Sequence, residues 1–297
     1  MKHIIGITAW RRPEFFLAAM RSMLVADRPD VHYLIRIDHD PHPNVLWVAD
    51  WFADRVRGRV DIRLAKPYDP VTNGLANLPD NNVLSMMHET LGYDAEYYHC
   101  TEDDVLVSRD YFGYHESAHA LHPYAFNATA CSLDLQHEPG PLNFHLARDS
   151  VRALNVAASY RRPVLEEALR YLPLDYLKDP IGHLARTFPN ADASSYWGID
   201  GALGRTRNAM GRSCVVPVIG RAYHIGYIGA RCWPVCDLPV IPGYPHRHGP
   251  QVEGTLMQQA QKLMTMTAEE YNERAEMKDH VVYDLGASFG PVTVLLS

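Results

Sequence analysis

Three things are scarce in this sequence, and each scarcity excludes a class of protein. None of its 297 residues belongs to an uncharged apolar run of about 18 residues, so we expect no membrane-spanning helix. The N-terminal segment passes directly from a short apolar run into charged residues, which does not fit a signal peptide, and we expect a cytoplasmic location. Positively charged residues are fewer than negatively charged ones, with 28 Lys and Arg against 35 Asp and Glu, which gives a net charge of -7. A general nucleic-acid-binding surface is therefore not expected.

Cysteine is too sparse for a disulfide framework. The chain has five cysteines, an odd number, and a chain of this length can bury a core without covalent links. We therefore expect reduced thiols. The hydrophobic content of 47% predicts a sizeable core, and we interpret the chain as one catalytic domain followed by a C-terminal appendage.

The first hundred residues alternate between apolar strand-like runs and amphipathic helical segments. We predict strands over 3–8, 31–37, 60–64 and 96–100, and helices from Pro13, over 44–55 and over 82–91. Strands that alternate with helices imply a parallel, doubly wound sheet. In such a sheet the ligand binds beyond the carboxyl ends of the strands.

Polar residues gather where these predicted strands end. Trp10-Arg11-Arg12 follows the first strand, Asp38-His39-Asp40 the second, and Glu102-Asp103-Asp104 the fourth. We therefore expect these three loops to meet at one edge of the sheet.

The alternation weakens after about residue 124. We predict strands over 124–132, 213–218 and 221–225, a helical segment over 150–172, a Gly- and Pro-rich lid over 226–250, a helix over 251–277, and a further strand in the last twenty residues.

One candidate site is His115-Glu116-Ser117-Ala118-His119, which has the H-E-x-x-H spacing of a zinc-protease helix. The extended form of that motif needs Gly at 122 and His at 125, where this chain has His122 and Ala125. The apolar spacing predicts a buried helix face, with the histidines as a stripe beside it on the surface. That face consists of Tyr111, Tyr114, Ala118 and Leu121, and the stripe of His115, His119 and His122. A zinc hydrolase built on His115 and His119 is retained as an alternative.

The other candidate is the acidic cluster Glu102-Asp103-Asp104. Three consecutive carboxylates repel one another, and a bound divalent cation removes that repulsion. Hard oxygen ligands select Mg²⁺ or Mn²⁺, usually through one or two carboxylates together with phosphate oxygens. The ordinary alternative is a helix N-terminus that carries acidic residues because of its dipole.

The acidic cluster and its continuation resemble the GT-A glycosyltransferases, specifically the inverting N-acetylglucosaminyltransferases that act on N-glycans and on protein O-mannose. The similarity lies in Thr101-Glu102-Asp103-Asp104-Val105 with Arg109-Asp110-Tyr111-Phe112, in Tyr196-Trp197-Gly198-Ile199-Asp200, in the segments 212–217 and 221–226, and in the N-terminal segment 7–13. It covers residues 3 to 230 discontinuously. Gly198-Ile199 replaces a more polar, acidic segment of that family.

The resemblance implies a fold and a reaction. The fold would be α/β and GT-A (Rossmann-like), with a mixed, mainly parallel sheet flanked by helices and a C-terminal helical appendage. Residues 1–235 would form the catalytic domain, with a nucleotide-sugar half (1–104) and an acceptor half (105–235), followed by a lid and helical extension (236–297). The reaction would be inverting transfer of a hexosyl or N-acetylhexosaminyl group from a nucleotide-diphosphate sugar, with UDP-sugar as the expected donor and Mn²⁺ or Mg²⁺ as cofactor.

The resemblance also assigns roles to individual residues. Asp104 would bind the metal, with His224 as an extra ligand or a structural histidine, and Asp200 would be the general base. The donor would contact Thr8, Arg12 near its base or phosphates, Asp38 at its base edge, Asp103 at its ribose, Glu102 at its sugar, and Trp197 as an apolar platform or an ordinary core residue.

The acceptor is left open by these residues. It could be a glycan, a protein side chain or a hydroxylated DNA base, as in phage modification systems. The basic segment Arg55-Val56-Arg57-Gly58-Arg59 fits the DNA case, and it equally fits a solvated corner between a helix and a strand. A non-catalytic protein that binds a nucleotide or a carbohydrate is a further alternative.

Overall fold

The computed structural model describes residues 1–66, 78–131, 144–147, 156–189, 198–217, 221–224, 280–284 and 291–295. The predicted lid at 226–250, the predicted helix at 251–277 and the candidate residue Trp197 lie outside these ranges.

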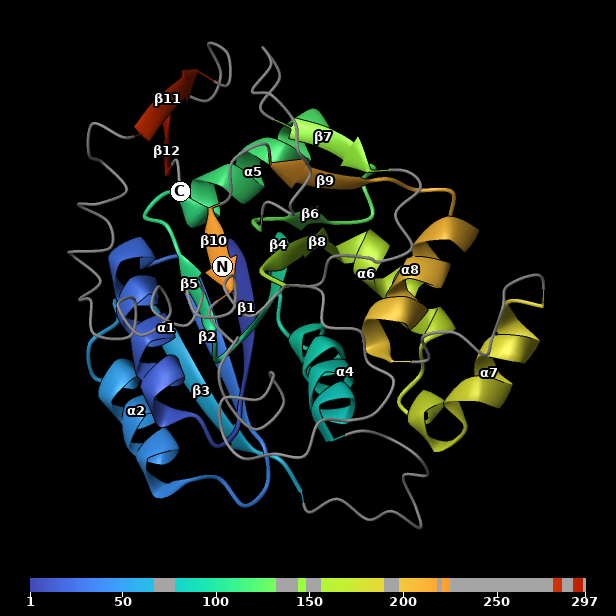
Figure 1. Cartoon of the computed structure of the whole chain (residues 1–297), viewed down its shortest axis with the longest axis horizontal. Coiled ribbons are helices and arrows are strands. Elements are labelled where there is room, and N and C mark those ends of the chain that lie inside the picture. Colours follow the sequence, from blue (N-terminus) through green and yellow to red (C-terminus); the bar gives the residue numbers. More distant parts are fainter. Residues whose placement is uncertain are drawn as a thin grey trace, which may run out of the picture.

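Within the described residues, eight strands form one sheet in the order β3-β2-β1-β4-β8-β6-β9-β7 (Figure 1). The strands are β1 (His3–Ala9), β2 (Val31–Ile37), β3 (Arg59–Leu64), β4 (Tyr97–Glu102), β6 (Ala128–Thr129), β7 (Phe144–Ala147), β8 (Ala158–Arg161) and β9 (Cys214–Pro217). The first four are mutually parallel, whereas β8 runs antiparallel to β4 and to β6, and β7 runs antiparallel to β9. Together with parallel β6 and β9 they make a mixed, mainly parallel sheet, as predicted.

Two short antiparallel pairs lie apart from this sheet. In one, β5 (Val105–Val107) pairs with β10 (Ala222–His224); in the other, β11 (His280–Asp284) pairs with β12 (Pro291–Leu295). The second pair contains the strand that we predicted in the last twenty residues. The helical appendage predicted for the C-terminus lies outside the described residues.

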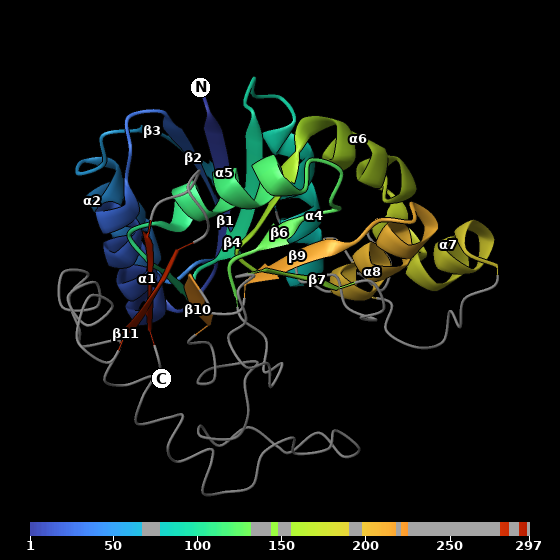
Figure 2. The same cartoon turned by 90° about the horizontal axis from the view of Figure 1, so that it is seen from above.

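Helices cover both faces of the sheet (Figure 2). The helices α1 (Pro13–Ala26), α2 (Pro43–Ala53) and α5 (Tyr111–Leu121) share one hydrophobic cluster, and α4 (Leu78–Thr90), α6 (Arg162–Tyr171) and α8 (Ile199–Ala209) share the other. A short 3₁₀ helix, η1 (Tyr176–Lys178), and α7 (Pro180–Thr187) extend the second group. This is the Rossmann-like α/β architecture that the sequence predicts, with a mixed, mainly parallel sheet flanked by helices.

Alternation along β1 separates the two clusters. Ile5 and Ile7 belong to the cluster of α1, whereas Ile4 belongs to the cluster of α4, because successive strand residues point to opposite faces. Gly6 also faces α4, and a Cβ atom there would lie 1.8 Å from the sulfur of Met86. Glycine therefore allows α4 to approach the central strand closely.

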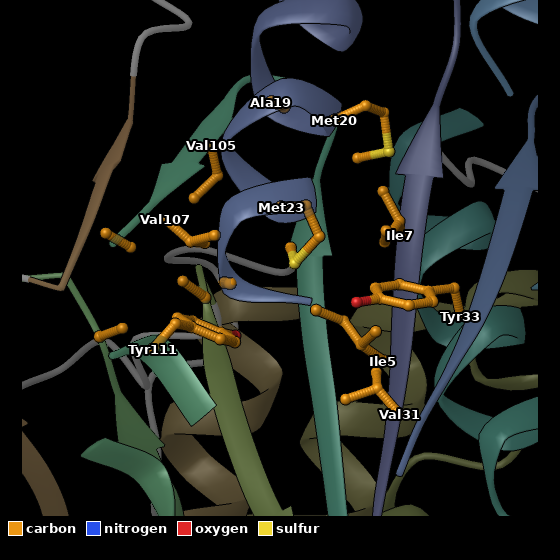
Figure 3. Close-up of a cluster of buried hydrophobic side chains, with 14 of the residues drawn as sticks. Ile5, Ile7, Ala19, Met20, Met23, Val31, Tyr33, Val105, Val107 and Tyr111 are labelled. Carbon is orange, nitrogen blue, oxygen red and sulfur yellow. The ribbon is translucent and has the colours of Figure 1, made fainter. Parts of the chain in front are cut away.

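The core on the α1 side extends directly to the acidic loop. Figure 3 shows Val105 and Val107 of β5 beside Ala19 and Met23 of α1, with Tyr111 below them. These β5 residues are at most 1% exposed. Hydrophobic packing immediately after Asp104 thus fixes where the acidic loop lies.

Several predicted elements differ from the structure. The segment predicted as a helix over 150–172 instead contains β8 (Ala158–Arg161) before α6 begins at Arg162. The strand predicted over 124–132 is only the two-residue β6. The fourth strand runs two residues further than predicted, so that Glu102 ends β4.

The predicted division of the chain at residue 104 falls within a continuous sheet. Strands β1 to β4 come from the first predicted half and β6 to β9 from the second. The domain boundaries themselves remain a prediction.

Strand β3 forms one of the two edges of the described sheet, and its residues are partly exposed. It carries charged residues at alternate positions, Arg59, Asp61 and Arg63. Among the described helices none has the length and hydropathy that a membrane crossing requires.

Candidate active site at the carboxyl edge of the sheet

The carboxyl ends of β1, β2 and β4 bring the three predicted polar loops together. In the sheet register Thr8 lies between Arg36 of β2 and Glu102 of β4. The residues that follow Thr8 and Glu102 therefore start from neighbouring positions. This places Arg12 next to Asp103 and Asp104.

Asp103 and Asp104 lie in the turn between β4 and β5, where they are 2% and 1% exposed. The guanidinium of Arg12 contacts both, with Nη2 2.5 Å from Asp103 Oδ1 and Nη1 2.7 Å from Asp104 Oδ2. The backbone N–H of Trp10 donates to Asp103 Oδ2 at 3.2 Å. Two buried carboxylates thus converge on one cationic group.

The start of α1 positions Arg12. Pro13 is the first residue of α1, where its missing N–H costs no helical hydrogen bond and its fixed φ suits the helix. Arg12 is the N-cap residue, with a backbone that is not helical (φ -118°, ψ 68°), so its side chain leaves from outside the helix. The end of β1 and the start of α1 together aim this side chain at the acidic turn.

The charge at this turn is not balanced. One guanidinium faces two carboxylates, and Glu102 adds a third acidic residue at the end of β4. Burial raises the pKa of Asp103 to about 6; the charge of Arg12 lowers that pKa and the charge of Asp104 raises it. The turn therefore favours additional positive charge.

The loop after β2 is joined to the loop after β1. The backbone N–H of Asp38 donates to the carbonyl of Ala9 at 2.8 Å, and Arg11 forms an ion pair with Asp40. Asp38 is buried, and its Oδ1 accepts the backbone N–H of His39 at 2.8 Å. Asp40 has φ of 53°, a left-handed conformation that Asp tolerates better than most residues.

His224, predicted as a further ligand, comes to the same turn from a distant part of the sequence. In the antiparallel pairing of β10 with β5, His224 lies opposite Val105, the residue directly after Asp104. The backbone of His224 is therefore adjacent to the acidic turn. Its role as a ligand remains a prediction.

Asp200 lies on the other side of the sheet, in the first turn of α8. Gly198 is the N-cap of α8, so Asp200 lies within the first turn of the helix and is not its capping residue. The N-terminus of α8 is held to α4, because the backbone N–H of Ile199 donates to Asp80 Oδ1 at 3.3 Å. Asn82 near the start of α4 donates to the carbonyl of Arg36, close to the carboxyl end of β2, so Asp200 lies at the edge of the sheet that carries the acidic turn. Its role as a base remains a prediction.

Sequence reasoning missed Arg221 and Cys131. Arg221 is 1% exposed; its Nε lies 3.6 Å from Asp110 Oδ2, and its guanidinium lies over the ring of Tyr114. Burial raises the pKa of the Cys131 thiol to about 12, and the nearby charges of Glu102 and Asp104 add to this effect. The resemblance drew attention to Asp110 as part of a motif. No pattern near Asp110 in the sequence shows that Arg221 is its partner.

The turn fits a divalent cation in part. One oxygen of each carboxylate contacts the same guanidinium, and two neighbouring carboxylates are hard ligands of the kind that hold Mg²⁺ or Mn²⁺ together with phosphate oxygens and water. In the described part of the chain, however, no group of three or more His, Cys, Asp and Glu side chains is arranged to hold a metal. The donor set from this chain is thus a pair of carboxylates, and Arg12 lies where the cation would bind.

The second candidate, His115 and His119, lies in the core and not on a surface stripe as predicted. These side chains are 0% and 1% exposed, whereas Leu121, predicted as buried, is 47% exposed. The Ser159 hydroxyl of β8 lies 2.7 Å from His115 Nδ1 and 2.9 Å from His119 Nε2. The buried face of α5 is therefore rotated toward the histidines.

We use the name histidine cluster for His3, His99, His115 and His119, which are all buried. His3 Nδ1 lies 3.0 Å from His99 Nε2, and the rings of His99 and His115 are 4.9 Å apart. His3 Nε2 lies 2.9 Å from Glu116 Oε1.

Glu116, which would be the catalytic base of a zinc hydrolase, is held by three cationic or polar partners. Lys2, Arg28 and His3 all contact its carboxylate. Burial opposes ionisation of Glu116, but these contacts outweigh burial and lower its pKa to about 2. A carboxylate that is so weakly basic, beside imidazoles that face a serine hydroxyl, does not support the zinc alternative.

No protein-family model matches this chain, and no curated protein matches it. Among solved structures the chain is similar to S. aureus TarS. For residues 1–349 of TarS the TM-score is 0.40 at 10% identity, over 57% of this chain and 48% of that one. The same segment in complex with UDP-GlcNAc gives 0.40 at 10% identity, over 57% and 47%, and in complex with UDP 0.39 at 11%, over 62% and 55%. The chain thus spans about half the length of these TarS structures.

Proposed function

We propose that this chain is a metal-dependent glycosyltransferase that moves a hexosyl or N-acetylhexosaminyl group, with inversion, from a nucleotide-diphosphate sugar to an acceptor hydroxyl. The observation that carries the proposal is the pair of buried carboxylates, Asp103 and Asp104, converging on one cationic position at the carboxyl edge of the parallel strands. This edge is where doubly wound sheets bind nucleotides. A UDP-sugar is the donor that the sequence resemblance favours.

The acidic turn serves the diphosphate end of the donor. Asp104 would hold Mn²⁺ or Mg²⁺, which neutralises the charge of a leaving diphosphate when bound. Asp103, which the resemblance assigns to the ribose, contacts the same guanidinium as Asp104 and would add a second carboxylate ligand. Arg12 supplies a second positive charge to the phosphates, since a guanidinium matches phosphate oxygens in a bidentate manner. Glu102, which ends β4, accepts hydrogen bonds from the donor sugar.

The loop after β2 serves the nucleoside end of the donor. Asp38 is buried there beside the end of β1, and it accepts hydrogen bonds from the edge of the base. Thr8 lies between the two loops in the sheet register and contacts the nucleoside.

Asp200 takes the proton of the acceptor. A carboxylate in the first turn of α8 stands on the face of the sheet opposite α1 and Arg12. From there it can remove the proton of a hydroxyl that attacks the anomeric carbon on the side away from the diphosphate. Attack from that side inverts the anomeric centre.

The decisive experiment is a thermal-stability screen of UDP-GlcNAc, UDP-glucose, UDP-galactose and GDP-mannose, each with and without Mn²⁺. A donor that binds the folded state at 100 times its Kd stabilises it by about 2.7 kcal/mol. We expect at least one donor to stabilise the protein only when Mn²⁺ is present. Asp104→Asn, which keeps the shape of the side chain but removes its charge, should abolish this metal-dependent shift.

The matched control is Asp54→Asn, a surface substitution at the C-cap of α2, which should shift like the wild type. If no nucleotide sugar stabilises the wild type in the presence of Mn²⁺, the proposal is wrong. Slow hydrolysis of the bound donor, followed by chromatography of the nucleotide, separates an enzyme from a non-catalytic binding protein. Binding without any hydrolysis or transfer would favour the binding protein.

A further inference from the structure

Arg12 contacts the two carboxylates that would hold a divalent cation. We propose that Arg12 is a displaceable counter-cation: it holds Asp103 and Asp104 together in the free protein, and it moves to the diphosphate when nucleotide and divalent cation arrive. Metal and nucleotide would therefore bind cooperatively, and neither would bind well alone. The inference rests on the proposed function, because it concerns the same site.

The geometry makes the guanidinium and a divalent cation compete. Arg12 uses two different terminal nitrogens, at 2.5 Å from Asp103 and 2.7 Å from Asp104, so both carboxylates are engaged at once. A cation that takes these two oxygens as ligands competes with Arg12 for both of them. Metal binding through these oxygens therefore weakens the ion pairs of Arg12, and the ion pairs weaken metal binding.

Burial explains why the free protein keeps Arg12 in this position. Asp103 and Asp104 are adjacent, ionisable and almost fully buried, and two neighbouring buried carboxylates without a cation are strongly disfavoured. The positive charge of Arg12 offsets this penalty. A metal ion that enters alone meets an occupied site.

Displacing Arg12 also requires a new partner for its guanidinium. The side chain of Arg12 is 23% exposed, in contrast to the carboxylates, so it reaches the solvent side of the turn. Because the side chain of Arg12 makes no capping hydrogen bond, it can move without breaking a hydrogen bond of α1. A diphosphate offers two oxygens in the geometry that a guanidinium prefers.

These two exchanges are linked. The nucleotide releases Arg12 from the carboxylates, and the metal releases the carboxylates from Arg12. Each ligand therefore raises the affinity of the other by the same factor, as thermodynamic linkage requires. Typical coupling factors between two sites are about 5 to 150.

The test uses the full-length protein with UDP as the nucleotide and Mn²⁺ as the metal. Mn²⁺ binding is measured by electron paramagnetic resonance of the free ion, with and without saturating UDP, and UDP binding by calorimetry, with and without Mn²⁺. For the wild type we expect weak binding of each ligand alone and at least about fivefold tighter binding of each in the presence of the other.

Arg12→Met removes the charge and retains the length of the side chain. We expect this variant to bind Mn²⁺ alone more tightly than the wild type and to show a smaller coupling factor, because only the direct attraction between the metal and the phosphates then links the two ligands. Arg12→Lys, which keeps the charge but cannot contact both carboxylates as a planar fork, should give intermediate values. If Arg12→Met does not fold, the Mn²⁺ affinity and the coupling factor of Arg12→Lys still test the proposal. Arg11→Met is the matched control from the same loop, and it should behave like the wild type because Arg11 pairs with Asp40.

Three results would overturn the inference. The first is unchanged or weaker Mn²⁺ binding in both Arg12 variants. The second is unchanged coupling in both. The third is tight UDP binding by the wild type without metal that both variants lose, since Arg12 would then replace the metal permanently. If UDP binds to no form of the protein, the proposed function fails, whereas Mn²⁺ titrations of the wild type and variants still decide whether Arg12 competes with the metal.

Discussion

The hydroxyl of Ser159 contacts one nitrogen of each of two buried imidazoles. It contacts His115 and His119, at 2.7 and 2.9 Å, in the interface between β8 and α5. We predict that Ser159→Ala lowers the free energy of unfolding by about 1–3 kcal/mol, because it leaves buried polar nitrogens without this partner. Urea denaturation followed by circular dichroism measures the change.

The control for Ser159 is Ser117→Ala on α5. The Ser117 hydroxyl donates to the carbonyl of Gly113 on the outer side of the helix, and such back-bonding adds little stability. We expect a change within about 0.5 kcal/mol. Equal effects of the two substitutions would show that the contact of Ser159 with the histidines contributes nothing specific.

Asp200 is the residue on which the proposed chemistry most depends. We predict that Asp200→Asn lowers turnover by about a hundred- to ten-thousand-fold while donor affinity stays close to that of the wild type, because only the basicity of the side chain is lost. Since Gly198 caps α8, the substitution does not remove a capping group. Steady-state transfer assays, together with donor titrations, provide the measurement.

Asp179→Asn is a suitable comparison for Asp200. Asp179 is a true N-cap, which accepts the backbone N–H of Gly182 at 3.0 Å, and Asn also caps well. Turnover of this variant should equal that of the wild type. Turnover at the wild-type level in Asp200→Asn would leave the base unassigned, and loss of donor binding would move Asp200 to the donor site.

At the scale of single residues, the sequence predicted which residues meet at the site better than it predicted how deeply side chains are buried. The strand-end positions of Arg12, Asp103 and Asp104 followed from alternation, and the structure places them together. The burial of His115 and His119 did not follow, because histidine is neither strongly apolar nor always charged. The pairing of Arg12 with both carboxylates depends on side-chain directions that a sequence pattern does not encode.

The interface between α5 and the sheet should be sensitive to acid. Burial lowers the pKa of all four residues of the histidine cluster below 6.5, that of His119 to about 4. The unfolded chain then binds protons that the folded chain does not. We predict that the free energy of unfolding falls as the pH decreases from 6.5 toward 4, by up to about 1.4 kcal/mol per pH unit for each histidine. Urea denaturation at intervals of half a pH unit tests this.

Two carboxyl groups bear on the same pH profile. Burial raises the pKa of Asp103 from 3.8 to about 6, so between pH 6 and pH 3.8 this group makes the folded state more stable as the pH falls. This effect opposes that of the histidines, but it comes from one group against four. Glu116, with its pKa lowered to about 2, supports stability above pH 4.5 and loses that effect only at lower pH. The fall between pH 6.5 and 4.5 therefore belongs to the histidines.

The variant His119→Gln removes one titrating group from the cluster. Its stability should be lower than that of the wild type at pH 7 and should fall less steeply below pH 6.5. His122→Gln, at the C-cap of α5 and partly exposed, is the control and should keep the slope of the wild type. An unchanged slope in His119→Gln would assign the acid sensitivity to other groups.

At the scale of elements, regular alternation was predictable and short strands were not. The first four strands and their helices agree with the sequence prediction to within a few residues. The segment 158–161 was predicted as helix because Arg162 to Tyr171 continues it with clear helical periodicity. Four residues are too few to show a period of two, and their strand conformation depends on pairing with β4 and β6.

The molecule has two hydrophobic clusters, one on each face of the sheet, that share the same strands. Ile5 and Ile4 of β1, for example, belong to different clusters although they are consecutive. We predict that Leu203→Ala, in the α8 cluster, lowers the free energy of unfolding by about 2–5 kcal/mol. Because the strands connect both faces, protection of α2 amides against hydrogen exchange should fall by the same amount.

Leu174→Ala is the control for this prediction, since Leu174 is 58% exposed. Its effect should be within about 0.5 kcal/mol. If Leu203→Ala accelerates exchange in α8 and α6 but leaves α1 and α2 unchanged, the two faces unfold independently.

At the scale of the whole molecule, the sequence predicted the parallel half of the sheet and not its continuation. Strand β8, some 60 residues after β4, pairs with it in the antiparallel direction. Strands β9 and β10 return from beyond residue 213 to complete the sheet and the acidic turn. Such pairings depend on contacts between distant segments, and local patterns carry no signal for them.

The charged edge strand β3 also affects how the protein behaves at high concentration. Another chain that added a strand there would have to bring its backbone alongside Arg59, Asp61 and Arg63. Alternating charges on an edge strand oppose such pairing, which is the first step of edge-to-edge aggregation. The same residues that end the sheet therefore help to keep separate molecules from joining their sheets into fibrils.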